Sequence, residues 1–177
     1  MKIVVLQGSP NKNGSTAILA ESFKKGAEEA GHSVKRFDIA AMDIKPCGGC
    51  VACGYEGPCV LKDANAEIRT AILEADMLVF ATPLYYYAMS AQLKTVIDRF
   101  CSYNSSITRK HMKSALLAVS WNSDGWTFEA LEGHYKTLVR YLNLQNQGMI
   151  LGRGCGTPSM TMRTQYPQMA YELGKRL

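Results

Sequence analysis

The sequence predicts a three-layer α/β fold with a five-stranded parallel sheet. Short β-rich apolar runs alternate with helical patterns along the chain, which is typical of parallel strands joined by crossover helices. The 177 residues can bury a sizeable core, and no linker, internal repeat or low-complexity tract divides them. We therefore expect a single domain over residues 1–177, with helices covering both faces of the sheet.

The chain should open with a strand, a helix and a second strand. Lys2–Gln7 contains a continuous apolar run and predicts a buried strand. A helix is expected over Thr16–Ala30, because apolar residues recur on one side of it and Gly31 follows its end. These apolar residues are Ile18, Leu19, Phe23 and Ala27. Ser33–Phe37 predicts the second strand, and a cysteine-rich loop at about residues 46–63 follows it.

The remaining elements continue the alternation of helix and strand. A helix at Asn65–Ala75 precedes the third strand, Met77–Ala81, which ends at Thr82 and Pro83. The later elements, in order, are a helix at Ser90–Ser102, a strand at Ala115–Ser120, a helix at Phe128–Leu142, a strand at Gln147–Leu151 and a helix at Gln168–Arg176. Ligands of such sheets bind beyond the carboxyl ends of the strands, so the loops after strands one, three and four should hold the site.

The loop after the first strand, Gly8–Thr16, is rich in glycine and hydroxyl residues and leads directly into a helix. A helix N-terminus offers free N–H groups and a partial positive charge, which attract phosphate. The spacing of Gly8 and Gly14 does not fit a nucleotide P-loop, and the G-x-G-x-x-G fingerprint is absent here. A capped turn without a ligand is the alternative. The predicted phosphate ligands are Ser9, Asn11, Lys12, Asn13, Gly14, Ser15 and Thr16.

The loops after strands three and four carry aromatic residues. Three consecutive tyrosines, Tyr85–Tyr87, cannot all enter the core, so some should be exposed and able to stack on a flat ligand. A dimer patch or ordinary surface aromatics are the alternatives. The predicted ring contacts are Pro83, Leu84, Tyr85, Tyr86, Trp121, Asn122 and Gly125. Together the three loops outline a pocket with a phosphate end and a planar end, which is the shape of FMN.

Four of the six cysteines fall within thirteen residues. Cys47, Cys50, Cys53 and Cys59 have the spacing C-x2-C-x2-C-x5-C, and glycines lie among them. We predict that these four thiolates hold a metal group, with an iron–sulfur cluster favoured because such clusters are held by cysteine thiolates. A four-thiolate zinc site and free or redox-active thiols are the alternatives.

The other residues with reactive side chains form no convincing acid–base or nucleophile constellation. We expect Cys101 to be a small buried residue in a helix, and nothing supports a role for Cys155. His32, His111 and His134 are expected at the surface, and Asp98 with Arg99 as a structural ion pair. We therefore predict no catalytic side chain, because the cofactors would carry the chemistry.

Charge and hydropathy limit the partners. The net charge is +5, but the basic residues form no run with interleaved aromatic residues, so no nucleic-acid partner is expected. The first apolar stretch, Ile3–Leu6, is too short for a signal-peptide core, and no run approaches the roughly 18 apolar residues of a membrane helix. These patterns predict a soluble cytoplasmic protein without a membrane partner.

Two stretches of the sequence resemble a known family. The motif G-S-P-x-K-N-G-S-T at residues 8–16 and the stretch A-T-P-L-Y-Y-Y-A-M-S-A-Q-L-K-T-V-I-D-R at residues 81–99 resemble the NADPH-dependent FMN reductase branch of flavodoxin-like proteins. With the cysteine run, the likeness is to the iron–sulfur flavoproteins of anaerobic microbes, over roughly residues 1–155. The resemblance implies a flavodoxin-like sheet, non-covalent FMN, a 4Fe-4S cluster and a homodimer or homotetramer.

Three hypotheses for the function follow. The first is an FMN-binding redox protein in which a ferredoxin-like carrier reduces the cluster, the cluster reduces FMN, and FMN reduces a small acceptor. The second is an NAD(P)H-dependent reductase of flavins or quinones, with FMN but no cluster. The third is a zinc-stabilised binding module without enzymatic activity.

Overall fold

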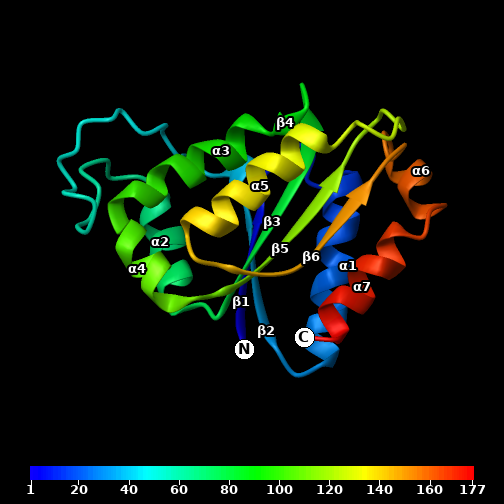
Figure 1. The fold of residues 1–177 in the computed structure, drawn as a ribbon, viewed down its shortest axis with the longest axis horizontal. Coiled ribbons are helices and arrows are strands. Elements are labelled where there is room, and N and C mark those ends of the chain that lie inside the picture. The colour runs from blue at the N-terminus through cyan, green and yellow to red at the C-terminus, as the bar shows by residue number, and fades with distance from the viewer.

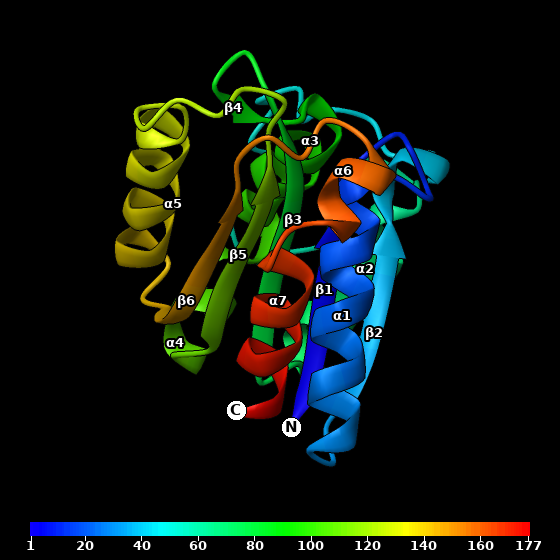
Figure 2. The ribbon, with the colours of Figure 1, turned by 90° about the vertical axis from the view of Figure 1, so that its right-hand side faces the viewer.

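The computed structural model describes residues 1–177 as a parallel sheet between two layers of helices. On one face lie α1 (Ser15–Glu29), α6 (Pro158–Met162) and α7 (Tyr166–Lys175), as Figure 2 shows. The other face is covered by four helices: α2 (Asn65–Glu74), α3 (Ala91–Asp98), α4 (Asn104–Lys110) and α5 (Glu129–Tyr141) (Figure 1). The predicted three-layer α/β fold is confirmed.

The sheet has five parallel strands and one short antiparallel addition. The strands are β1 (Lys2–Gln7), β2 (Ser33–Asp38), β3 (Met77–Tyr85), β5 (Lys113–Val119) and β6 (Gln145–Gly152), in the order β2-β1-β3-β5-β6. All four neighbouring pairs in this order are parallel. The short β4 (Ala88–Met89) pairs antiparallel with the end of β3. Because the strand order reverses between β1 and β3, a ligand crevice is expected at the carboxyl ends of these strands.

Alternating side chains of each strand enter two separate hydrophobic cores. Along β1, Val4 and Leu6 belong to the core beneath α2–α5, whereas Ile3 and Val5 belong to the core beneath α1 and α7. A strand covered on both faces must be apolar at every position, which explains why β1 and β3 are continuous apolar runs rather than alternating ones.

Helices α1 and α7 pack closely because glycines face the neighbouring backbone. A Cβ at Gly26 of α1 would lie 2.1 Å from the carbonyl oxygen of Tyr171, and one at Gly174 of α7 would lie 2.2 Å from that of Phe23. No side chain fits at either position without moving a helix. This contact fixes α1, the helix whose N-terminus was predicted to bind phosphate, against the C-terminal part of the chain.

Several element boundaries differ from the prediction. The helix predicted at Ser90–Ser102 is α-helical only over α3 and continues as a 3-10 helix, η2 (Arg99–Tyr103), before the unpredicted α4. A shorter 3-10 helix, η1 (Ile39–Ala41), follows β2. The unpredicted α6 has Pro158 in its first turn, and its preceding residue Thr157 accepts a hydrogen bond from the Met160 N–H at 3.2 Å.

None of the helices combines the length and the apolar character that crossing a membrane would require.

Candidate functional site

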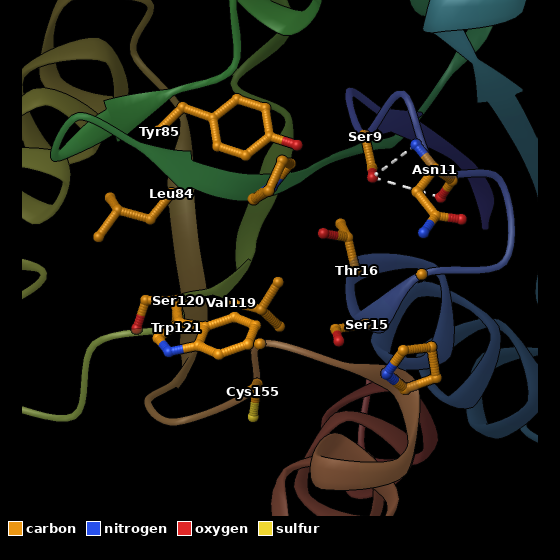
Figure 3. A pocket seen from close by; sticks show the side chains of 14 residues that line it. Ser9, Asn11, Ser15, Thr16, Leu84, Tyr85, Val119, Ser120, Trp121 and Cys155 are labelled. Atoms are coloured by element: carbon orange, nitrogen blue, oxygen red, sulfur yellow. Dashed lines mark hydrogen bonds between the residues drawn. The ribbon is translucent and has the colours of Figure 1, made fainter.

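A pocket of about 290 Å³ opens at the carboxyl ends of β1, β3 and β5. Figure 3 shows its side chains, which come from the carboxyl ends of β3 and β5, from the start of α1 and from the loops after β1, β5 and β6. The pocket is lined by Ser9, Asn11, Gly14, Ser15, Thr16, Pro83, Leu84, Tyr85, Val119, Ser120, Trp121, Cys155, Gly156 and Pro158. The pocket therefore lies where the strand order predicts a ligand crevice.

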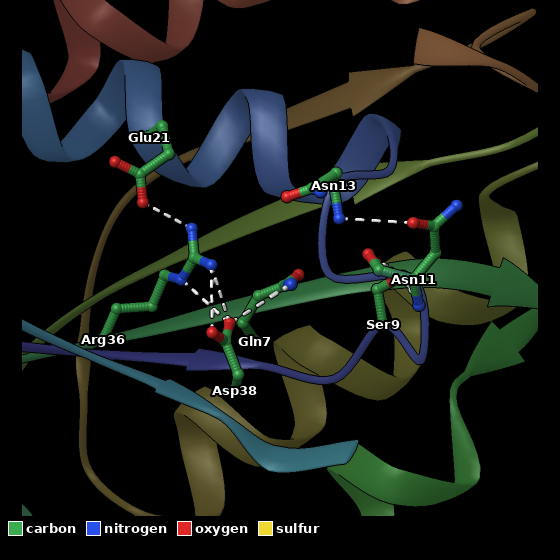
Figure 4. Close-up of polar contacts among 7 residues, drawn as sticks. All are labelled: Gln7, Ser9, Asn11, Asn13, Glu21, Arg36 and Asp38. Carbon is green, nitrogen blue, oxygen red and sulfur yellow. Dashed lines mark hydrogen bonds and ion pairs between the residues drawn. The ribbon is translucent and has the colours of Figure 1, made fainter. Parts of the chain in front are cut away.

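The loop between β1 and α1 is a turn that holds its own shape. The Ser9 hydroxyl donates to the Asn11 carbonyl oxygen at 3.3 Å and accepts from the Asn11 N–H at 3.2 Å (Figures 3 and 4). The Asn11 side-chain oxygen accepts from the Asn13 N–H at 3.2 Å, and the Asn11 carbonyl oxygen from the Gly14 N–H at 3.1 Å. Hydrogen bonds among its own residues therefore fix the shape of the loop.

Two hydroxyl groups at the start of α1 have no hydrogen-bond partner. Ser15 and Thr16 are 7% and 1% exposed, and neither side-chain oxygen has a partner. Gly14, which caps α1, has no side chain, so the first N–H groups of the helix also lack a side-chain acceptor. A buried unpaired polar group costs about 1–3 kcal/mol. An anionic ligand such as a phosphate would satisfy these donors, so the residues present fit it.

Ser90 connects this loop to helix α3. Its hydroxyl donates to the Gly8 carbonyl oxygen at 2.7 Å and accepts from the Leu93 N–H at 3.3 Å. A Cβ at Gly8 would lie 2.6 Å from the Ser90 hydroxyl oxygen, so only glycine fits there. The loop after β1 is therefore fixed to α3, the helix that follows the tyrosine-rich segment.

The other end of the pocket lies between aromatic side chains. Tyr85 and Trp121 stand on opposite sides of the opening in Figure 3, and Leu84 lies beside them. The Trp121 ring packs against Gly156, where a Cβ would lie 2.1 Å from the indole Cε3 atom. Since Trp121 is 71% exposed, most of its ring remains available to a ligand. A flat heteroaromatic ring fits this slot.

No charged side chain lines the pocket. The nearby Arg36 donates to Asp38 at 2.9 Å and also pairs with Glu21, and Gln7 donates to Asp38 at 3.4 Å (Figure 4). Because Arg36 is already neutralised, the pocket offers a phosphate only neutral donors and the N-terminus of α1.

The structure brings some of the predicted site residues together and leaves others outside. Those that line the pocket are Ser9, Asn11, Gly14, Ser15, Thr16, Pro83, Leu84, Tyr85 and Trp121. Those that do not are Lys12, Asn13, Tyr86, Asn122 and Gly125. Tyr86 is 99% exposed on the turn between β3 and β4. The carbonyl oxygens of Asn122 and Gly125 instead bind the Gly154 N–H and the Arg153 guanidinium, respectively, which holds the loop after β6 in place.

Five lining residues were not predicted: Val119, Ser120, Cys155, Gly156 and Pro158. Three of them come from the segment after β6, which also ends at the carboxyl edge of the sheet. The Cys155 N–H donates to the Ser120 carbonyl oxygen at 2.7 Å, so this segment is continuous with the loop after β5. The rule that ligands bind beyond the carboxyl ends of parallel strands applies equally to the fifth strand, and it would have predicted the three residues after β6.

The cysteine loop lies at the opposite end of α3 and forms a second cavity of about 750 Å³. Cys47, Cys50, Cys53 and Cys59 all line it, and all are free thiols. No three cysteine, histidine or carboxylate side chains converge on one point that could hold a metal ion. The predicted metal ligands therefore share a cavity without forming a closed coordination site.

Cys101 also lines this cavity, contrary to the prediction that it is a buried core residue. It lies in η2, is half-buried, and its Sγ is 3.8 Å from the Sγ of Cys47. Burial, together with the neighbouring Cys47, raises the pKa of the Cys101 thiol to about 12. The prediction was wrong because a helical pattern does not show which surface segment will lie against the helix.

Arg99 forms an ion pair, but not with Asp98 as predicted. Its Nη1 atom donates to Asp63 Oδ2 at 2.8 Å and its Nη2 atom to Asp63 Oδ1 at 3.2 Å, while Asp98 pairs with Lys94 at 2.5 Å. The Arg99 and Asp63 side chains are 1% and 2% exposed. Burial alone would raise the pKa of Asp63, but hydrogen bonds from Arg99 and from two backbone N–H groups outweigh it and lower that pKa.

The prediction that all three histidines lie at the surface holds fully for only one of them. His111 is exposed, whereas His32 and His134 are half-buried. Burial lowers the pKa of His32 and of His134, which disfavours their charged forms. None of the three lines the pocket at the sheet edge or the cysteine cavity.

The fold is flavodoxin-like, and its pocket lies at the carboxyl edge of the sheet. The family model described as NADPH-dependent FMN reductase matches residues 1–146, and the chain belongs to this family. The predicted family is therefore confirmed.

Known proteins with related sequences fall into two groups. An iron–sulfur flavoprotein of Archaeoglobus fulgidus is 36% identical over 110 residues, which cover 62% of this chain and 50% of that protein. An NADPH azoreductase of a Bacillus species is 32% identical over 127 residues, which cover 71% of this chain and 62% of that protein. The chain thus spans about half to two thirds of the length of these relatives.

Among solved structures, an NAD(P)H:quinone oxidoreductase from Methanothermobacter marburgensis superimposes with a TM-score of 0.81. The match covers 99% of this chain and 95% of that chain at 20% sequence identity. At this identity the similarity establishes the fold, which is the flavodoxin-like fold that the sequence predicts.

Proposed function

We propose that this protein is an FMN-dependent oxidoreductase that holds FMN non-covalently in the pocket at the carboxyl edge of the sheet. The observation that carries the proposal is the pair of buried, unpartnered hydroxyls of Ser15 and Thr16 at the N-terminus of α1. Membership of the NADPH-dependent FMN reductase family supports FMN as the ligand.

The first loop would hold the phosphate. The Ser15 and Thr16 hydroxyls and the free N–H groups of α1 would donate hydrogen bonds to it, and the partial positive charge of the helix N-terminus would favour its negative charge. Ser9 and Asn11 line the same end of the pocket. Lys12 and Asn13, which we also predicted as ligands, are exposed outside the pocket and would contribute only at longer range.

The aromatic end would hold the ring. Pro83, Leu84 and Tyr85 would cover one side and Trp121 the other, and these side chains would shield the ring from water. When bound, FMN supplies hydride transfer and single-electron transfer, which no side chain of this pocket can perform. The chain itself would bind and orient the ring.

We further propose that Cys47, Cys50, Cys53 and Cys59 hold a 4Fe-4S cluster that passes electrons to FMN. Four thiolates in one loop form a donor set suited to such a cluster. The loop has room to close around it, since a Cβ at Gly48, Gly49 or Gly54 would meet no atom within 4 Å. The iron–sulfur flavoprotein relatives support this assignment. A ferredoxin-like donor and a homodimer or homotetramer belong to the same proposal.

A second candidate function is an NAD(P)H-dependent reductase without a cluster. The azoreductase relative supports it, and NAD(P)H would then be the electron donor. The zinc-stabilised binding module is disfavoured because the chain belongs to an oxidoreductase family.

Replacing Ser15 and Thr16 together with alanine tests the FMN site. We expect FMN binding to weaken by about 2–3 kcal/mol, because each hydroxyl would bond a charged phosphate. The measurement is a fluorescence titration of flavin-free protein with FMN. Thr137→Ala is the control, since its exposed hydroxyl bonds only the Gly133 carbonyl oxygen on α5. An unchanged affinity in the double variant would refute the phosphate assignment.

The absorption spectrum of protein purified without oxygen tests the cluster. FMN gives two visible bands, and a 4Fe-4S cluster adds a broad shoulder with about four iron atoms per chain. Cys50→Ala should remove the shoulder and the iron while keeping the FMN bands, and the control variant Thr137→Ala should keep both. A spectrum with flavin bands alone in the wild type would favour the second candidate function.

A further inference from the structure

A fifth thiol lies beside the cysteine loop. Cys101 follows Cys47 by 54 positions, yet their sulfur atoms are 3.8 Å apart. Both side chains are half-buried and both line the cavity of the loop cysteines. Neither is part of a disulfide bond. Cys101 is not among the four predicted metal ligands, so its position requires a separate explanation.

Arg99 holds the two thiols together. Its Nη1 atom donates to the Lys45 carbonyl oxygen at 2.8 Å. Cys47 lies two residues after Lys45, and Cys101 lies two residues after Arg99. The Asp63 carboxylate binds the same guanidinium and also accepts from the Lys45 N–H at 3.0 Å. The backbone segments that carry the two thiols are therefore fixed side by side by buried groups rather than by anything bound within the loop.

We propose that Cys47 and Cys101 form a thiol–disulfide site that reacts with low-molecular-weight disulfides. One protein thiolate attacks a sulfur atom of the reagent, forms a mixed disulfide and releases one reagent thiol. The second protein thiol attacks the mixed disulfide and releases the other reagent thiol. The two cysteines lose two electrons and two protons, and the reagent disulfide gains them as two thiols.

The loop can accommodate this bond. A disulfide has an S–S distance of about 2.05 Å, so the two sulfur atoms must approach by about 1.8 Å from their separation of 3.8 Å. Gly48 and Gly49 directly follow Cys47, and a Cβ at either would meet no atom within 4 Å. The open space at these two positions leaves room for the approach.

Oxidation of this site would change what the loop can bind. The disulfide engages Cys47 and leaves three loop thiols, Cys50, Cys53 and Cys59, instead of four. The state of the Cys47–Cys101 pair would thus control loading of the metal site. This consequence rests on the proposed cluster, whereas the disulfide itself does not.

The test uses the 177-residue chain, reduced, treated with a chelator and then exposed to an excess of glutathione disulfide. After alkylation of the remaining thiols, trypsin releases Phe100–Arg109, which contains Cys101 as its only cysteine, and Phe37–Lys62, which contains the four loop cysteines. We expect these two peptides joined by a disulfide as the main oxidised product. The joined species should be lost in Cys101→Ser and Cys47→Ser and retained in Cys50→Ser and Cys155→Ser.

Recovery of Phe100–Arg109 only as the alkylated or glutathione-linked peptide would overturn the proposal. Retention of the joined peptides in Cys47→Ser would do the same, because another loop cysteine would then be the partner. Even if a variant folds poorly, the peptides recovered from the wild type show whether Cys101 forms a disulfide with the cysteine loop. Bound flavin, read by its absorption in the same samples, reports separately on the proposed FMN site.

Discussion

The pocket at the sheet edge and the cysteine loop are held in place in different ways. The pocket is built from loops that bond one another: Ser90 binds Gly8, Cys155 binds Ser120, and Gly156 packs under Trp121. The cysteine loop has few such internal contacts and is fixed mainly at its two ends, through Asp63 and Arg99. The pocket is therefore held by contacts among its own loops, whereas the cysteine loop depends on the contacts at its base.

The largest expected effect concerns the buried ion pair between Arg99 and Asp63 at the base of the cysteine loop. Asp63→Ala leaves the Arg99 guanidinium buried without its partner, and we expect the free energy of unfolding to fall by about 3–5 kcal/mol. Urea denaturation followed by circular dichroism measures this change. Lys94→Met, which removes the exposed ion pair with Asp98, serves as the control and should cost less than about 1 kcal/mol.

Equal losses in these two variants would show that the buried pair does not fix the loop. Asp63→Ala could also lower the free energy of unfolding while leaving the affinity for FMN unchanged. That result would show that the pocket at the sheet edge and the cysteine loop are stabilised independently.

The fold and the position of the loop before α1 could be predicted from the sequence, because both depend on patterns among residues close together in the chain. A buried strand is a continuous apolar run, and a loop such as Gly8–Gly14 follows directly from where that run ends. The five parallel strands and the position of Ser15 and Thr16 at the start of α1 follow from the same pattern. These features depend on residues that are neighbours in the chain.

The residues missed by sequence reasoning make contacts over long sequence separations. Arg99 pairs with Asp63, 36 positions earlier, and Cys101 meets Cys47, 54 positions earlier. The helical pattern around Arg99 suggested a partner on the same helix, because only the folded chain shows that the base of the cysteine loop lies against η2. Cys155 and Gly156 were missed because the loop after the fifth strand was not considered.

A pair of glycine substitutions tests whether the pocket is rigid and the loop adaptable. In Gly156→Ala the added methyl group would overlap the Trp121 ring, and we expect a loss of about 1–3 kcal/mol in stability, with weaker FMN binding. In Gly48→Ala the methyl group would enter open space, and the change should stay within about 0.5 kcal/mol. Unfolding curves of both variants measure the change in stability, and FMN titrations measure the change in affinity. Similar losses would contradict the distinction between the two regions.

The smallest expected effect is a difference in FMN affinity between variants of the neighbouring residues Tyr85 and Tyr86. Tyr85 lines the pocket, whereas the side chain of Tyr86 is almost fully exposed. Tyr85→Ala should weaken FMN binding by about 0.5–1.5 kcal/mol, the range measured for aromatic stacking. Tyr86→Ala should leave the affinity unchanged, although sequence reasoning placed both residues at the ring. FMN titration of the two variants distinguishes these outcomes, and a larger loss in Tyr86→Ala would place the ring on the other side of the turn.

Comparing the affinities of the flavin-free protein for FMN and for riboflavin tests the central claim most directly. The two ligands share the ring and differ in the phosphate that we assign to Ser15, Thr16 and the N-terminus of α1. We predict that FMN binds at least about a hundredfold more tightly, equivalent to about 2.7 kcal/mol, and that most of this preference disappears when both hydroxyls are removed. Equal affinities for the two ligands would contradict the account, because the start of α1 would then play no part in binding.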